Sequence, residues 1–127
     1  MEKKIILDTN FLLIPGHYKV DIFSEIDRIC NFKYKIILFD RVVEELMQIL
    51  KAERKKDREA AKLALALIKA KHLKTTPSNS EEYVDNLIVN TADDSTIVAT
   101  EDKWLRKKLR QKNIQLVYLR NQHLVLK

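Results

Sequence analysis

Apolar residues follow two alternating patterns along the chain. Short runs rich in Ile, Val and Leu predict strands that are buried on both faces, as in a parallel sheet. These runs occupy residues 4–8, 34–39, 73–76, 96–100 and 114–119. Longer stretches place their apolar side chains on one helical face, and they occupy residues 20–29, 41–50 and 54–71. The alternation predicts an α/β fold, a three-layer α/β/α sandwich with a central, mostly parallel sheet of four to five strands.

The length and composition predict one domain over residues 1–127, with a short C-terminal tail from about residue 120. Pro15 and Pro77 fall in predicted loops, and Ser80 is the predicted N-cap of a further helix. Gly16 is the only glycine. Glycine-rich phosphate-binding loops need several glycines, so ATP-driven and dinucleotide-dependent functions are disfavoured.

The net charge of +6 favours a polyanionic partner, and nucleic acid is the first candidate. The basic residues predicted to bind RNA are Lys51, Lys55, Lys103, Arg106 and Lys107. Such charge runs are also typical of solvated helix faces. Trp104 lies among them, and it could stack on an unpaired base or pack against the sheet.

The chain has one cysteine, Cys30, which excludes an intramolecular disulfide and a multi-cysteine zinc site. No apolar run reaches the roughly 20 residues that span a bilayer, and the first ten residues lack a signal-peptide pattern. We therefore expect no membrane partner and a cytoplasmic location.

Four carboxylates stand where strands pass into helices or in early helical turns: Asp8, Glu45, Asp85 and Asp102. Ligands of open α/β sheets bind beyond the carboxyl ends of the strands, where these acids should meet. Each acid alone could be a helix cap or could compensate the helix dipole. Four carboxylates in one confined site, however, repel one another unless cations offset the charge. The pattern predicts a Mg²⁺ or Mn²⁺ site, whereas the Asp93 and Asp94 pair should lie at the opposite edge.

The sequence segments around these acids resemble the four signatures of PIN-domain ribonucleases. They are LDTN at residues 7–10, VVEEL at 42–46, YVDNLIV at 83–89 and IVATED at 97–102. The resemblance implies a metal-dependent endoribonuclease in which Asp8, Glu45, Asp85 and Asp102 are the catalytic, metal-binding acids. It selects Glu45 rather than Glu44, and it implies supporting or substrate-positioning roles for Asn10, Thr100 and Asn86. Asn86 stands where many relatives have a second acid.

Three alternatives remain open within this family. The segments at residues 83–89, 97–110 and 114–122 are similar to those of the branch that processes ribosomal RNA, which implies a precursor RNA substrate. A VapC-like toxin, inhibited by a small antitoxin, would use the same chemistry. A non-catalytic RNA-binding scaffold would retain only the fold. Leu63, Leu67 and Ile68 could serve a helix-mediated homodimer or belong to the core.

Overall fold

The computed structural model describes residues 2–78 and 81–127, and within them one sheet lies between two layers of helices. This arrangement confirms the predicted α/β/α sandwich. The strands are β1 (Lys3–Leu7), β2 (Tyr34–Phe39), β3 (Thr75–Thr76), β4 (Thr96–Ala99), β5 (Gln115–Arg120) and β6 (His123–Leu126). The helices are α1 (Thr9–Leu12), α2 (Ile14–Tyr18), α3 (Ile22–Ile29), α4 (Asp40–Ile49), α5 (Lys55–Ala70), α6 (Val84–Thr91) and α7 (Lys103–Gln111).

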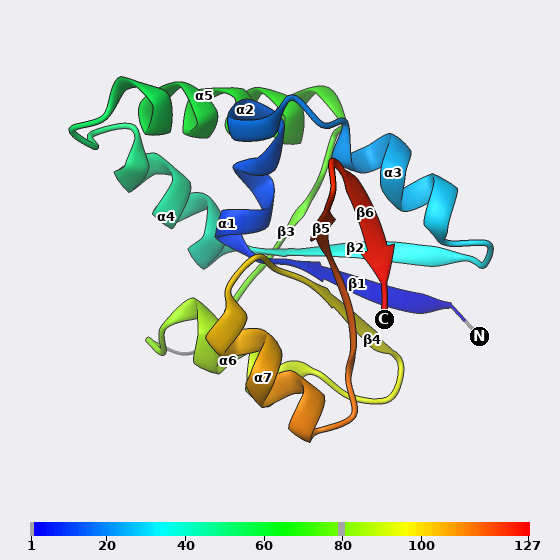
Figure 1. Ribbon diagram of the computed structural model, residues 1–127. Coiled ribbons are helices and arrows are strands. Elements are labelled where there is room, and N and C mark those ends of the chain that lie inside the picture. Colours follow the sequence, from blue (N-terminus) through cyan, green and yellow to red (C-terminus); the bar gives the residue numbers. More distant parts are fainter. Residues whose placement is uncertain (1, 79–80) are drawn as a thin grey trace.

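The strand order is β3-β2-β1-β4-β5-β6, and every pair except β5 with β6 is parallel. The chain first moves from β1 towards β3 and then returns through β4 and β5. Because parallel crossovers are right-handed, this reversal sends α1–α5 to one face of the sheet and α6 and α7 to the other. Figure 1 shows these two layers above and below the sheet.

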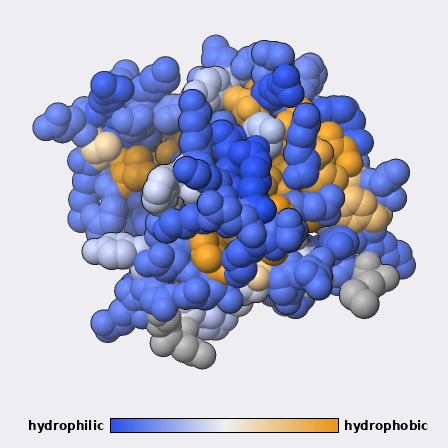
Figure 2. Space-filling model, turned by 60° about the horizontal axis from the view of Figure 1, so that its bottom comes forward, coloured by the Kyte–Doolittle hydropathy of each residue, from blue (hydrophilic) through white to orange (hydrophobic). Residues whose placement is uncertain are grey.

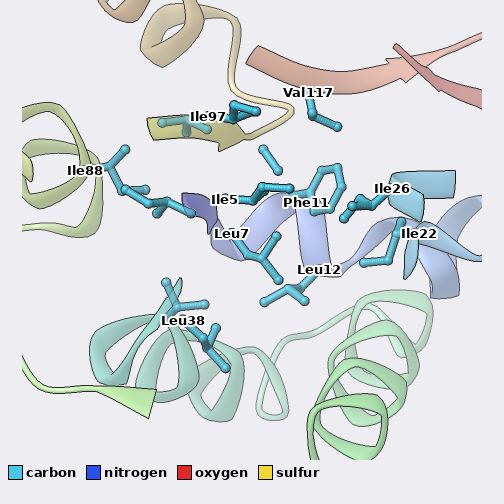
Figure 3. Close-up of a cluster of buried hydrophobic side chains, with 14 of the residues drawn as sticks. Ile5, Leu7, Phe11, Leu12, Ile22, Ile26, Leu38, Ile88, Ile97 and Val117 are labelled. Carbon is cyan, nitrogen blue, oxygen red and sulfur yellow. The ribbon is translucent and has the colours of Figure 1, made fainter. Parts of the chain in front are cut away.

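The central strands explain the stability of the sheet. In β1, Ile5 pairs with Ile36 of β2 and with Ile97 of β4. Ile5 and Ile97 are fully buried. In Figure 3 the labelled side chains of the sheet meet those of α1 and α3, with Phe11 among them. Each such aliphatic or aromatic side chain contributes about 1.5–3 kcal/mol when it is removed from water. This core fixes β1 and β4 side by side.

The short helices α1 and α2 occupy residues 9–12 and 14–18, so the prediction that Pro15 lies in a loop was wrong. Proline is tolerated in the first turn of a helix, where its missing N–H has no intrahelical partner. Gly16 then lets α2 approach α5 closely. A Cβ placed on Gly16 would lie 2.5 Å from the Ala60 Cα and 2.7 Å from its Cβ.

The C-terminal residues form a sixth strand, where the sequence pattern predicted a tail and a sheet of four to five strands. Asn121 and Gln122 adopt positive φ angles of 52° and 65°, as the right-handed twist of a two-residue hairpin requires. β6 then pairs antiparallel with β5. The usual Asn-Gly signal is absent because Gln122 takes the second position, which explains why the sequence did not reveal the turn.

The outer edge of β6 is bonded to side chains of α3. The Leu124 N–H donates to Glu25 Oε1 at 2.9 Å, and Arg28 donates to the Leu124 carbonyl at 3.1 Å. Arg28 also donates to both oxygens of Glu25, at 2.8 and 3.0 Å. Glu25 and Arg28 thus take the place of a neighbouring strand, and we call them the edge clamp.

Three further findings concern the helices and the surface. Helix α6 begins at Val84 with Tyr83 as its N-cap, while the predicted cap Ser80 lies outside the described residues. None of the helices in the described part of the chain combines the length and apolar character of a membrane span. Hydrophilic residues dominate the face drawn in Figure 2. Of the residues considered for a dimer, Ile68 belongs to the core, whereas Leu63 is exposed.

Candidate active site

One pocket of about 610 Å³, which we call the acid pocket, is lined by all four acids, Asp8, Glu45, Asp85 and Asp102. Asp8 directly follows β1, and Asp102 lies just beyond β4. Glu45 comes from α4, which follows β2, and Asp85 comes from the first turn of α6. The fold therefore brings four distant segments of the chain to one edge of the sheet. Their function as catalytic and metal-binding residues stays a prediction.

Asp8 is the most buried of these acids, with 7% of its surface exposed. Burial raises the pKa of its carboxyl to about 6, since removal from water penalises the charged form. The hydrogen bonds from the Thr100 hydroxyl and the Thr9 N–H oppose this rise, and the negative charges of Glu45 and Asp102 add to it. The pocket therefore holds Asp8 in an environment where a nearby positive charge would be strongly favoured.

Thr100 links two of the acids. Its hydroxyl donates to Asp8 Oδ2 at 2.6 Å and accepts the N–H of Asp102 at 3.1 Å. Asp102 also caps α7, because its Oδ1 accepts the N–H groups of Trp104 and Leu105. Capping occupies one of the two carboxylate oxygens of Asp102 and leaves the other for the role that the sequence predicts.

Asn10, in α1, supports the same turn. Its Oδ1 accepts the backbone N–H of Glu101 at 3.0 Å and lies 3.3 Å from the Thr100 hydroxyl. Asn10 also lines the pocket. These contacts fix the position of the turn between β4 and α7, so the supporting roles predicted for Asn10 and Thr100 are consistent with their bonds.

Glu45 faces the pocket, whereas its neighbour Glu44 does not line it. The Thr9 hydroxyl donates to Glu45 Oε1 at 2.5 Å and fixes the side chain. Glu44 instead forms a long ion pair of 3.9 Å with Arg41. The sequence analysis did not predict a supporting role for Thr9, although its position directly after Asp8 could have indicated one.

The remaining acids divide between the two edges of the sheet. Asp85 Oδ1 accepts the N–H of Asn86, and both residues line the pocket. Asp93 lies in the turn before β4, where its carboxylate accepts hydrogen bonds from Ser95 and Thr96. Asp94 is in the same turn, and its backbone carbonyl accepts a hydrogen bond from the Lys3 ammonium. This turn is at the amino end of the parallel strands, as the sequence predicted.

The donor set of the pocket suits a hard divalent cation, because its charged donors are carboxylate oxygens. In residues 2–78 and 81–127, no group of three or more His, Cys, Asp or Glu side chains is positioned to hold a metal ion as it stands. The pocket is therefore not a closed four-carboxylate cage. Mg²⁺ commonly keeps several waters and binds proteins through one or two carboxylates, which this open arrangement fits.

The basic residues predicted to bind RNA fall into two groups. Lys103 and Arg106 line a pocket that shares Asn10 and Leu13 with the acid pocket. Lys51 and Lys55 lie at the connection of α4 and α5, and Lys55 lines a different pocket with Gly16. The acid pocket and the Lys55 pocket have no lining residue in common among the described residues.

Trp104 is 61% exposed, which answers the question left open by the sequence: it does not pack against the sheet. The ammonium groups of Lys107 and Lys108 lie 5.8 and 5.7 Å from its ring centre. Lys108 also lines the acid pocket. This part of α7 therefore presents an aromatic ring and two positive charges beside the acids.

Comparisons with known proteins bear on the family and the fold of the chain. The family model described as PIN like domain matches residues 5–122. The chain is 37% identical over 119 residues to Ribonuclease VapC4 of Methanocaldococcus jannaschii, covering 92% of this chain and 90% of that protein. It also resembles a solved structure of the PIN domain endonuclease Utp24, with a TM-score of 0.81 and 24% identity. That match covers 98% of this chain and 90% of the other.

Proposed function

Because the chain belongs to the family of PIN-like domains, we propose that it is a metal-dependent endoribonuclease that hydrolyses RNA phosphodiester bonds. One observation supports this function above all others: four carboxylates from four segments line a single pocket. The name of the 37% identical relative, Ribonuclease VapC4, supports RNA as the substrate.

Asp8, Glu45, Asp85 and Asp102 would hold Mg²⁺ or Mn²⁺. A bound cation would supply charge neutralisation at the phosphate and would lower the pKa of a water. The chain prepares the site for this charge through Thr100 and Thr9, which fix the carboxylates of Asp8 and Glu45. A positioned side chain needs no reorganisation when the substrate arrives.

The test compares Asp8→Asn with Asp94→Asn, which removes an acid from the opposite edge of the sheet. Asp8→Asn should abolish Mn²⁺-dependent cleavage of single-stranded RNA, whereas Asp94→Asn should cleave like the wild type. Circular dichroism of both variants checks that the fold is intact. Undiminished cleavage by a folded Asp8→Asn protein would contradict the proposed function.

A non-catalytic RNA-binding scaffold is distinguished by the cation itself. A ligand that binds only the folded state must raise the melting temperature. Mn²⁺ should therefore stabilise the wild type and stabilise Asp8→Asn much less. A melting temperature of the wild type that is independent of Mn²⁺ would favour the scaffold.

The biological substrate has two candidates. The relative named VapC4 supports the VapC-like alternative, in which expression of the chain arrests growth and a small antitoxin relieves the arrest. The resemblance of residues 83–89, 97–110 and 114–122 to the branch that processes ribosomal RNA supports ribosomal RNA precursors instead. Crosslinking of cellular RNAs to Asp8→Asn would separate the two. Recovery of ribosomal precursors alone, without growth arrest by the wild type, would support processing.

Two further properties belong to the proposal. We also propose a cytoplasmic location, and cell fractionation would test it. A homodimer through α5 would need Leu63, which is the exposed member of the three residues considered. Leu63→Glu should then convert a dimer into a monomer in sedimentation experiments.

A further inference from the structure

A second pocket, of about 420 Å³, adjoins the acid pocket at Asn10 and Leu13. We call it the arginine pocket. Its acidic and basic lining residues are His17, Glu101, Lys103 and Arg106. His17 is bonded to Asp57 of α5 at 3.0 Å, so its role is to join α2 to α5. Two cations, Lys103 and Arg106, therefore face one carboxylate, that of Glu101.

Arg106 is held in place by the ring of Tyr118 and by a long ion pair with Glu101. Its side chain is only 12% exposed, and its guanidinium carbon lies 4.3 Å from the ring centre of Tyr118. The closest carboxylate is Glu101 at 4.0 Å, which is too long for a hydrogen bond. Glu101 Oε2 instead accepts the N–H of Leu119 at 2.9 Å.

The Arg106 side chain also has unused hydrogen-bonding capacity. Its Nε is buried and has no hydrogen-bond partner in the described part of the chain. A buried polar group without a partner is costly, and native structures rarely contain one without a reason. The planar guanidinium matches the geometry of phosphate oxygens, which it binds through paired hydrogen bonds. The buried Nε is itself out of reach of a ligand. A phosphate in the pocket would bind the terminal nitrogens of the guanidinium and would be a closer acceptor than the Glu101 carboxylate at 4.0 Å.

Asn10 stands at the boundary between the two pockets. Its side-chain oxygen Oδ1 accepts the backbone N–H of Glu101. The side-chain NH₂ group is therefore the part of the amide that can donate hydrogen bonds to a ligand. We propose that the arginine pocket binds an RNA backbone phosphate adjacent to the phosphate that is cleaved over the acids. This assignment rests on the proposed function. It makes Arg106 and Lys103 substrate-positioning residues, with Asn10 between the two phosphates.

The first test measures binding of a short single-stranded RNA by fluorescence anisotropy in EDTA, where no cleavage occurs. Arg106→Gln should weaken binding at least about tenfold, as expected for a lost charge-assisted contact. It should also reduce the slope of log K against log salt by about 0.7. Lys103→Gln, an exposed change that leaves the interior intact, should weaken binding in the same direction.

The matched control is Arg110→Gln. Arg110 is on the same helix and lies 5.7 Å from the same Tyr118 ring, but it does not line the arginine pocket. This variant should keep both the affinity and the salt slope of the wild type. Equal losses for Arg106→Gln and Arg110→Gln would overturn the proposal, because general electrostatic attraction would then explain the binding. RNAs with and without a 5′-phosphate should bind equally, and a preference for the terminal phosphate would overturn it too.

The second test uses cleavage to define the register of the RNA. Each RNA contains one neutral methylphosphonate linkage in place of a charged phosphate. The wild type should lose cleavage at the neutral linkage and at one further position, always at the same distance and on the same side. Arg106→Gln should no longer show the second loss. If the wild type loses cleavage only at the neutral linkage, the proposed phosphate site in the arginine pocket is wrong, while the nuclease function stands. If no RNA is cleaved, the proposed function fails and the binding test still decides the pocket.

Discussion

Replacement of Glu25 by Gln tests whether the edge clamp stabilises the C-terminal hairpin. The carboxylate of Glu25 accepts two hydrogen bonds from Arg28, one from the Leu124 N–H and one from His123. The hydrogen bonds from Arg28, followed by those from Leu124 and His123, lower the pKa of Glu25 from 4.5 to about 2. The charged form is therefore favoured in the folded state.

The magnitude follows from this difference in pKa. A shift of one pKa unit corresponds to about 1.4 kcal/mol, so the full shift sets an upper value of roughly 3.4 kcal/mol. Arg28 is 54% exposed, and solvent screening of such a pair reduces the effect to about 1–2 kcal/mol. Because the folded-state pKa is the lower one, this stability is complete above the unfolded pKa of 4.5. It is lost as the pH falls through about 2.

The assay is urea unfolding of the wild type and Glu25→Gln at a series of pH values. At about pH 7 the variant should be less stable by roughly 1–2 kcal/mol, and the difference should shrink below about pH 4.5. Glu59→Gln is the control, since Glu59 forms an exposed ion pair of 3.8 Å with Lys55. A pH-independent difference, or a loss no larger than that of Glu59→Gln, would refute the role of the clamp.

Substitutions at three further positions test separate features. Gly16→Ala should destabilise the protein by about 1–3 kcal/mol in urea unfolding, because the new methyl group would overlap the Ala60 backbone; an unchanged midpoint would contradict the close approach of α2 and α5. His72→Gly should stabilise it by about 0.5–1 kcal/mol, since His72 has a φ of 53° at the C-terminus of α5, and a lower melting temperature would speak against this. Thr100→Val should reduce RNA cleavage more than tenfold without unfolding the protein, because the hydroxyl that links Asp8 to Asp102 is lost. Thr100→Ser keeps a hydroxyl and should therefore restore cleavage. Equal activity of the two variants would exclude a role of this hydroxyl in positioning the acids.

Most strands and long helices could be predicted from the sequence, because buried parallel strands and amphipathic helices carry distinct apolar patterns. The parts that could not be predicted depend on tertiary contacts. The helix over residues 14–18 contains Pro15 and Gly16, both of which usually indicate a loop, and it exists because Gly16 fits against Ala60. Strand β6 depends on an unusual Gln122 in the turn and on the bonds of Glu25 across 99 residues of sequence.

The candidate site divides in the same way. The positions of Asp8 and Asp102 follow from the ends of two neighbouring strands, which the sequence contains. The hydrogen bond of Thr9 to Glu45 joins residues 36 positions apart and depends on the packing of α1 against α4. The orientation of Arg106 depends on Tyr118 of β5. Residue identities therefore indicated the acids together with Asn10 and Thr100, whereas the contacts of Thr9 with Glu45 and of Tyr118 with Arg106 required the structure.

The edge clamp also has a consequence for assembly. An exposed edge strand is a template on which a strand from another molecule can pair. On β6, the Leu124 N–H and carbonyl that such a strand would need are already bonded to Glu25 and Arg28. At the other edge, β3 has only two residues. A strand from a second copy of the chain, or from an inhibitory protein, would therefore have to displace the edge clamp before it could pair with Leu124.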